Sequence, residues 1–409
     1  MRVSTQSFYE QSRVAMGGQQ SSLLRVQQQL GAGTKILAPS DDPLGATRAL
    51  AVSQSIALNA QYAASRGHAV QSLTLEENAL QSVTTVMQSI KTQLIAAGNG
   101  TLTDVDRATI AGTLQSSMDQ LQGLANSDDG NGQFLFAGFK SGSAPFTLQA
   151  DGSMKYNGDQ GQRMVQVDVS RQMAGADDGR SIFQSVQGGA GYVSASPASS
   201  SSAPNAGSGV FSSVSVVDVS NTSYGQDFEI NFVDANNYTV TTRSQPPVTS
   251  ASTGYTAGSA ISFGGLQISI SGEPAAGDSF SVATAKNAGT NVFEAINDVI
   301  KALKVPVDTG APAAKAQLLN ALSTGNVKIT NAHDNVLTVR SSVGSRLQEL
   351  DALQVTGDSR KLADKSYLSD LQDLDYAAAI AEFYQRQTAL QASQQTFVKI
   401  QQIALFNYL

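Results

Sequence analysis

The sequence predicts an α+β protein of several domains: a long-helix coiled-coil core built from both chain ends, with an inserted antiparallel β domain. Two observations predict the helical core. Apolar residues recur at seven-residue spacing near both termini, and long segments free of proline lie next to them. A third predicts the insertion, because residues 133–290 are rich in Gly, Ser, Thr and Val and contain short runs of alternating apolar and polar residues.

The last residues of the chain carry the longest apolar seam. Reading from Tyr376 in steps of four and three gives Tyr376, Ile380, Phe383, Gln387, Leu390, Gln394, Phe397, Gln401, Ala404 and Tyr408. No Gly or Pro interrupts residues 366–409, which predicts one continuous helix. One helix cannot bury such a seam by itself, so it needs a partner.

The N-terminal segment is the expected partner. Tyr9, Met16, Leu23, Leu30 and Leu37 recur every seven residues, with Val26 between two of them. The segment is basic, whereas the C-terminal helix begins with several Asp residues, and both features favour an antiparallel pair. Two ordinary core helices of a globular domain are the alternative. Gln-rich faces favour helices that become buried only when many subunits assemble.

These seams define the candidate assembly residues. They are Tyr9, Met16, Leu23, Val26, Leu30, Tyr376, Ile380, Phe383, Leu390, Phe397, Ile400, Ala404 and Tyr408.

Composition limits the function classes. The 409 residues allow two or three domains, and a net charge of −7 argues against nucleic-acid binding. Cysteine is absent, which excludes disulfides and thiolate chemistry, and two His with no Trp make a catalytic cleft less expected. We see neither the apolar core of a signal peptide nor a run of membrane-spanning length, so we expect no membrane partner and export without a cleaved signal. No motif predicts a catalytic residue, a cofactor or a metal.

Helix signals follow the first segment in order. Asp42 followed by Pro43 predicts an N-cap and a first helical residue. The helix of residues 43–97 carries Leu73, Leu80, Met87 and Leu94 in one register, with Leu44, Val52, Ile56, Ala63 and Val70 extending the stripe upstream. Thr103 with Asp106 resembles a capping box for a third helix. Residues 126–132 are acidic and Gly-rich, but they lack a Glu at the twelfth loop position, which favours a turn over a calcium site.

Six runs in the middle of the chain predict strands: 164–169, 214–219, 228–232, 238–242, 266–270 and 280–282. They suit an antiparallel sandwich or barrel. Residues 188–209 are rich in Ser, Ala, Gly and Pro, which predicts a mobile surface loop. We expect that residues 146–278 can be deleted without unfolding the helical core.

Helical patterns return after the β region. Residues 293–303 are amphipathic, 305–312 form a linker and 314–354 carry a long apolar stripe, after which Gly357 is expected to open a junction. The predicted domains are therefore a terminal coiled-coil assembly domain (1–42 and 356–409), a long-helix bundle (43–132 and 291–355) and an outer β domain (133–290).

Three stretches resemble the flagellin superfamily of bacteria, and within it the hook–filament junction family, hook-associated protein 3. The first ends in Ser40, Asp41, Asp42 and Pro43, and the second contains Phe134, Leu135, Phe136, Ala137 and Gly138. The third runs from Leu374 to the C-terminus and includes the ending Phe406-Asn407-Tyr408-Leu409. The likeness covers roughly residues 1–145 and 291–409 and says little about the middle.

The resemblance implies a secreted structural adapter of the bacterial flagellum, exported unfolded through the type III channel with the help of a chaperone. Its implied partners are hook-associated protein 1 on the hook side, flagellin on the filament side and further copies of itself in a ring. The terminal coiled coil would line the channel and the β domain would face outward.

Two other functions stay open. A flagellin that polymerises into the filament is one, although residues 133–138 and the C-terminal ending speak against it. An enzyme or a sugar-binding protein acting through the β domain is the other. His68 and His333 both lie in helical segments outside that domain, and the pair Asp177-Asp178 predicts a turn more readily than a calcium or sugar site.

Overall fold

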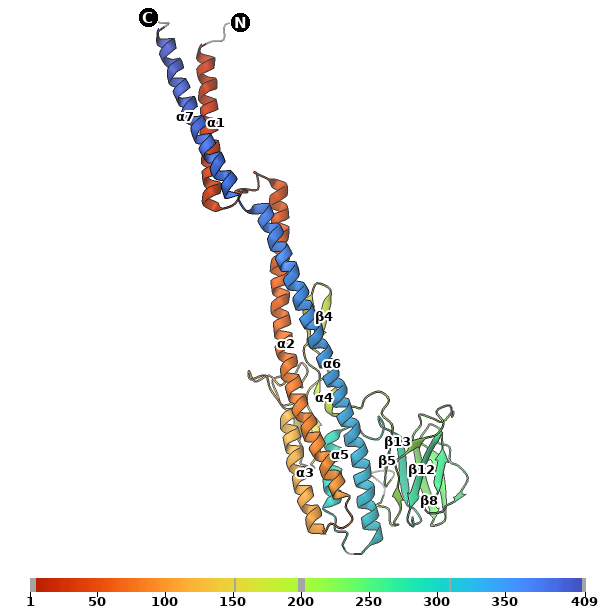
Figure 1. The fold of residues 1–409 in the computed structure, drawn as a ribbon. Coiled ribbons are helices and arrows are strands. Elements are labelled where there is room, and N and C mark those ends of the chain that lie inside the picture. The colour runs from red at the N-terminus through yellow and green to blue at the C-terminus, as the bar shows by residue number, and fades with distance from the viewer. Residues whose placement is uncertain (1–4, 151, 198–202, 309, 407–409) are drawn as a thin grey trace. The chain divides into compact units, whose positions relative to one another are not determined.

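The computed structural model describes residues 5–150, 152–197, 203–308 and 310–406, with the side chains of 5, 6, 8 and 400–406 left out. The chain forms two compact units (Figure 1). Unit 1 comprises Met1–Ala64 and Ala352–Leu409, and unit 2 comprises Ser65–Asp351. The helices are α1 (Thr5–Ala32), α2 (Pro43–Ala97), α3 (Asp104–Ala125), α4 (Gly179–Phe183), α5 (Val292–Leu303), α6 (Pro312–Gln372) and α7 (Tyr376–Phe406).

These elements confirm the predicted fold class, since both chain ends contribute long helices and antiparallel sheets are inserted between them. The predicted caps are also confirmed. Thr103 and Asp106 form a reciprocal capping box at the start of α3. Asp42 accepts a hydrogen bond from the Gly45 N–H at 2.9 Å, and Pro43 is the first residue of α2.

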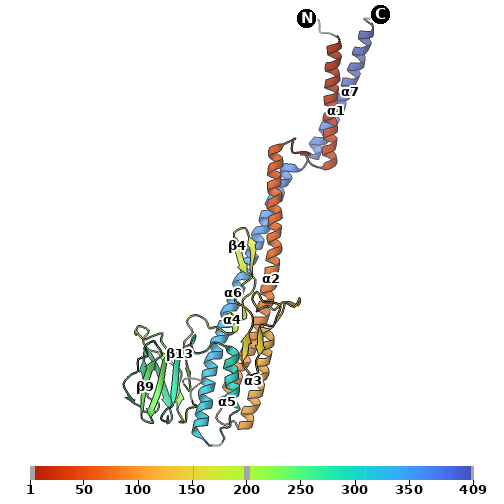
Figure 2. The same cartoon turned by 180° about the vertical axis from the view of Figure 1, so that it is seen from behind.

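In unit 1 the chain ends form an antiparallel pair, and α1 and α7 lie side by side in both views (Figures 1 and 2). Two short connections meet below this pair. The Lys35 N–H donates to the Gln372 carbonyl at 2.8 Å, and the Leu374 N–H donates to the Gly33 carbonyl at 3.1 Å. Gly33 has φ +72°, a conformation that glycine adopts without strain. The α1–α2 and α6–α7 connections are therefore tied to each other.

The prediction of one continuous helix over 366–409, opened by a junction at Gly357, is wrong. Helix α6 passes through Gly357, whose carbonyl accepts a hydrogen bond from Asn59 of α2 at 2.6 Å. One helical glycine costs only about 1 kcal/mol, and packing of this kind offsets it. The chain breaks instead at 373–375, where the Asp375 carboxylate accepts the Ala377 N–H at 3.0 Å and caps α7.

The predicted register of α2 is confirmed in its C-terminal half, where Leu73, Leu80, Val83, Met87, Ile90 and Leu94 are all buried. Upstream the prediction fails in part, since Leu44 and Val70 are 61% and 39% exposed. Seven-residue steps back from Leu73 lead to Arg66 and Asn59. Arg66 is buried and donates to the Val167 carbonyl at 3.0 Å, so a polar side chain occupies the seam where it can reach a backbone acceptor.

Four aromatic rings join the helices of unit 2 to the segment after α3. Phe146 contacts Phe183 at a ring-centroid distance of 5.4 Å and Phe293 of α5 at 5.3 Å, and Phe136 contacts Phe183 at 5.8 Å. Phe146 belongs to a hairpin of β1 (Phe146–Leu148) with β2 (Met154–Tyr156), and a second hairpin pairs β3 (Met164–Asp168) with β4 (Arg171–Ala174). Because Phe146 and Phe183 belong to this helical core, the expected deletion of 146–278 would remove part of it.

The remaining strands form a sandwich of two antiparallel sheets, visible beside α6 in Figures 1 and 2. One sheet has the order β10 (Thr253–Gly254), β9 (Asn237–Thr242), β8 (Phe228–Asp234), β13 (Ser279–Thr284), β5 (Tyr192–Ala195). The other has the order β11 (Ala260–Phe263), β12 (Leu266–Ser271), β6 (Val210–Phe211), with β7 (Ser215–Val216) also paired to β12. Alternate residues of β8 and β12 fill a shared apolar core that includes Phe228, Ile230, Leu266 and Ile268.

Each of the six predicted runs overlaps a strand, although only two residues of 214–219 belong to one, β7. The prediction that 188–209 is a mobile loop fails for its described residues. They include β5, and the buried Asn205 donates to the Ser279 carbonyl at 2.9 Å. Residues 126–132 form the predicted turn, closed by an antiparallel bridge between Asp128 and Phe134.

Candidate functional site

The terminal helix pair of unit 1 is the candidate site, and its own apolar contact is thin. Val26 and Ala379 are the only buried hydrophobic residues among the described side chains of α1 and α7. Tyr9 packs edge-on against Phe397 at a ring-centroid distance of 5.9 Å. Such a seam stabilises the pair weakly within one chain.

The structure places one predicted α7 register toward α1 and displaces the other. Phe383, Leu390 and Phe397 are half-buried, as the seven-residue spacing predicts. The predicted companion residues Ile380, Gln387 and Gln394 are exposed. Their places in the contact are taken by the residues one position earlier, Ala379, Arg386 and Ser393. Small Ala and Ser side chains allow the helices to approach, whereas the Gln amides stay in water.

The other predicted seam residues fall into three groups. Met16, Leu23 and Leu30 of α1 are half-buried, like Tyr9. Tyr376 and Ile380 are 52% and 45% exposed, so they lie off the intrachain contact. The side chains of Ile400 and Ala404, and the whole of Tyr408, lie outside the described residues.

A polar hollow of about 540 Å³ lies between α1 and α7. Gln19 lines it from α1, with Ala378, Glu382 and Arg386 on the α7 side. The Gln19 side-chain oxygen is buried and has no hydrogen-bond donor among the described residues. A neighbouring molecule could supply that donor.

Large apolar side chains are exposed along the whole of unit 1. They are Val14 and Leu24 of α1, Leu44, Leu50 and Leu58 of α2, Val355, Leu362 and Tyr367 of α6, and Tyr376, Ile380, Tyr384 and Val398 of α7. Leu362 is 72% exposed and Val355, seven residues earlier, 62%. The sequence-based prediction missed these α6 residues because it ended the helix at 354, although their heptad spacing was visible. Exposed apolar surface of this extent is typical of an interaction face.

The signature residues named from the resemblance have structural roles. Asp41 forms an ion pair with Arg25 at 3.0 Å, next to the exposed Ser40. Phe136 and Ala137 are buried, and Phe134 and Leu135 are half-buried. Gly138 has φ +68°, and a Cβ there would lie 2.3 Å from an Asp159 carboxylate oxygen, so this position requires glycine.

Of the polar residues considered for chemistry, Asp177 and Asp178 sit in structural contacts, whereas neither ring nitrogen of His333 has a hydrogen-bond partner among the described residues. His333 is buried on α6, 3.5 Å from Asp334, and His68 is exposed on α2. Asp178 caps α4 by accepting the Ser181 N–H at 2.9 Å, and Asp177 forms an ion pair with Arg346. Across the described part of the chain, no three His, Asp or Glu side chains could together hold a metal ion. None of the described helices has the length and hydropathy needed to cross a bilayer.

Comparison with known proteins relates both the helices and the sandwich to flagellar proteins. Residues 3–141 match a family described as the bacterial flagellin N-terminal helical region, and residues 200–284 match one described as flagellar hook-associated protein 1, D2-like domain. The flagellar hook-associated protein 3 of Salmonella typhimurium is 32% identical over 406 residues, which cover 99% of both chains. This chain belongs to the flagellar hook-associated protein 3 family.

Other members of the family agree in sequence and fold. The hook-associated protein 3 of Escherichia coli is 31% identical over 99% of both chains. The crystal structure of Xanthomonas campestris FlgL is 29% identical, with a TM-score of 0.67 over 78% of this chain and 99% of that one. The hook-associated protein 3 structure from Legionella pneumophila has the same TM-score at 28% identity, over 78% of this chain and 98% of that one. The protein is therefore a component of the flagellum.

Proposed function

We propose that this protein is a structural, non-enzymatic adapter that joins the flagellar hook, through hook-associated protein 1, to the flagellin filament. Copies of the chain assemble into a ring through their terminal helices, in the extracellular part of the flagellum. Before assembly an export chaperone holds the chain for type III secretion.

The exposed apolar surface of unit 1 carries this proposal. Burying apolar surface of this kind stabilises an assembly by about 25 cal/mol per Å², and a monomer gains nothing by exposing it. Helices α1 and α7 bury little against each other, so most of their apolar surface is available to neighbouring copies. Membership in the hook-associated family supports flagellar components as the partners.

The three predicted domains take separate roles in this proposal. Residues 1–42 and 356–409 form the assembly domain, and residues 43–132 and 291–355 form the supporting bundle. Residues 133–290 face outward. The likeness of 200–284 to a domain of hook-associated protein 1 supports an outer module of the same kind in neighbouring segments of the flagellum.

A filament subunit is the less supported alternative. The flagellin family match ends at residue 141, whereas the hook-associated protein 3 relatives match the full chain. Electron microscopy of a strain that lacks the gene separates the two roles. An adapter predicts hooks without filaments and flagellin shed into the medium, whereas loss of the filament subunit predicts missing filaments without shed flagellin.

The exposed face can be tested in the same strain. Leu362→Asp places a carboxylate on the apolar face where the monomer has solvent, so folding should be unchanged and filament attachment should fail. Ala363→Asp is the matched control, because Ala363 is also exposed and receives the same charge one position along α6. Equal swimming by both variants would contradict assembly through this face.

A further inference from the structure

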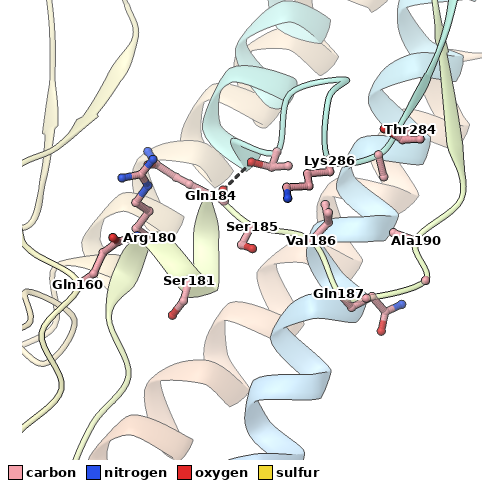
Figure 3. A pocket seen from close by; sticks show the side chains of 14 residues that line it. Gln160, Arg180, Ser181, Gln184, Ser185, Val186, Gln187, Ala190, Thr284 and Lys286 are labelled. Atoms are coloured by element: carbon pink, nitrogen blue, oxygen red, sulfur yellow. Dashed lines mark hydrogen bonds between the residues drawn. The ribbon is translucent and has the colours of Figure 1, made fainter. Parts of the chain in front are cut away.

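A cavity of about 650 Å³ lies in unit 2 where α4 and the segment after it meet the end of β13 (Figure 3). Gln184, Ser185 and Gln187 line one side, and Thr284 and Lys286 line another. Its volume falls within the range of ~300–1,000 Å³ typical of small-molecule sites. Nine of its fourteen lining residues have polar side chains, which offer hydrogen-bonding groups to a ligand.

The charge of the lining is unusual for this protein. Among the described residues that line it, Arg180 and Lys286 are the only ionisable side chains and none is a carboxylate, although the chain has 33 acidic and 26 basic residues. Neither cation forms an ion pair with any described residue. In Figure 3, Ser185 lies between Arg180 and Lys286. Two unpaired cations on one cavity favour an anionic ligand.

Nearby acids do not neutralise these cations by direct contact. Asp227 directs one oxygen to the Thr284 N–H at 2.8 Å and the other to the Asn287 amide at 2.7 Å. Glu294 lines an adjoining hollow of about 430 Å³, which also includes Arg180 and Gln184. The Lys286 end of the main cavity is therefore the place where a negative charge is best stabilised.

The uncharged lining adds hydrogen-bonding groups of the kind that hydroxyl-rich molecules use. The Gln184 carbonyl accepts the Thr290 hydroxyl at 2.5 Å, and the Gln187 side-chain oxygen accepts the Thr338 hydroxyl at 3.1 Å. These bonds fix the backbone of Gln184 and the amide of Gln187, so the wall is held in position before any ligand enters. Preorganised polar groups cost less entropy on binding than mobile ones.

A peptide is a poorer match to this wall. Peptides bound in extended form gain their affinity from main-chain pairing with a free strand edge. Only one strand residue, Thr284 at the end of β13, lines the cavity, and its N–H is already bonded to Asp227. A metal ion is disfavoured because both charged side chains are cations.

We propose that this cavity binds an acidic saccharide, with Lys286 and Arg180 holding its anionic groups and the Gln and Ser side chains holding its hydroxyls. The site lies in unit 2 and is separate from the assembly role proposed above. Binding at this cavity gives unit 2 a function of its own, besides the assembly role of unit 1.

Calorimetric titration of the full chain tests the site. Trigalacturonate serves as the carboxylated probe, glucose 6-phosphate as the phosphorylated one and maltotriose as the neutral match. We expect binding of an acidic probe that weakens with added salt, and no binding of maltotriose. Lys286→Gln or Arg180→Gln should weaken it by roughly tenfold, and the double variant should abolish it.

Lys140→Gln, at an exposed lysine outside the cavity, is the control and should bind like the wild type. Thermal melts verify that each variant is folded. Binding of neither acidic probe, or binding that survives the double variant, would overturn the site. Equal binding of a tetraglutamate peptide, lost in the same double variant, would overturn the saccharide assignment in favour of an acidic segment of a protein partner.

Discussion

Glu76 of α2 is a fully buried carboxyl group in the helical part of unit 2. One of its oxygens accepts the Asp177 N–H at 3.3 Å, and the other has no hydrogen-bond donor in the described part of the chain. Burial first, and the nearby Asp177 carboxylate second, raise the pKa of Glu76 to about 8, against a partial opposing effect of Arg346. Glu76 is therefore protonated at neutral pH in the folded protein.

This burial predicts a falling stability with rising pH. The pKa of Glu76 is higher in the folded state than its ordinary value of 4.5, so the folded state binds the proton more tightly. The resulting stabilisation is complete below pH 4.5 and is lost progressively as pH rises to about 8. Between pH 5 and 8.5 we expect a loss on the order of a few kcal/mol from this group.

Glu76→Gln isolates that contribution, because the amide has the same shape and does not ionise. Chemical denaturation at a series of pH values should show a smaller pH slope in the variant than in the wild type. Identical slopes would mean that Glu76 is not a buried neutral acid. The sequence alone could not predict this group, since a Glu on a long helix is usually solvated and Asp177 follows 101 residues later.

At the scale of elements, the sandwich is connected to the rest of unit 2 by two neighbouring chain segments. The Ala285 N–H donates to the Gly191 carbonyl at 3.1 Å, so the chain enters and leaves at adjacent residues. Polar contacts anchor the sandwich to α6, including the buried Asn320, which donates to the Gly209 carbonyl at 2.9 Å. The aromatic cluster around Phe146 contains no residue of the sandwich.

Removing residues 192–284 and joining Gly191 to Ala285 through a short Gly-Ser link should leave a folded protein. The deletion exposes mainly polar side chains of α6, so we expect high helix content by circular dichroism and one cooperative melt. Deleting 146–278, the range expected from the sequence, removes two rings of the aromatic cluster and should give an aggregating product. Cooperative folding of both, or of neither, would contradict this boundary.

The sequence predicted best the elements whose pattern is local and repeated. The heptads in the C-terminal half of α2 and the period of β8 and β12 specify both structure and buried face, and the caps at Asp42 and Thr103 specify where helices begin. Short elements without such a pattern, such as β4 and α4, could not be predicted because contacts with α2 and α6 stabilise them. Within one chain, Ile380 lies off the α1–α7 contact for a related reason: it looks like a seam residue by hydropathy, but close packing selects the smaller Ala379.

At the scale of the whole molecule, the two units differ in how much apolar surface they bury. Unit 2 contains the α2 core, the aromatic cluster and the sandwich core, whereas the α1–α7 pair of unit 1 buries very few residues. Local stability follows buried apolar contact. The terminal helices are therefore the part of the molecule expected to open first.

Hydrogen–deuterium exchange on the dilute monomer measures this difference. Residues 1–30 and 370–409 should exchange within seconds to minutes, and residues 65–97 of α2 should be protected for hours. Assembly should slow exchange at the termini, because neighbouring copies cover them. Strong protection of both termini in a verified monomer would show that the pair is an ordinary core.

If the terminal helices are the assembly element, as we propose, Phe397→Asp should prevent assembly. Phe397 contacts Tyr9, and a buried unpaired carboxylate costs more than the ~2–3 kcal/mol that burying a Phe supplies, so the substitution should abolish this contact. Gln391→Asp is the control, because Gln391 is exposed on the same helix.

The measurement is electron microscopy of flagella together with the melting temperature of the secreted variant. We expect that Phe397→Asp is secreted and melts within a few degrees of the wild type, while hooks lack filaments, and that Gln391→Asp assembles normally. Normal filaments with Phe397→Asp, or an unfolded monomer, would contradict it.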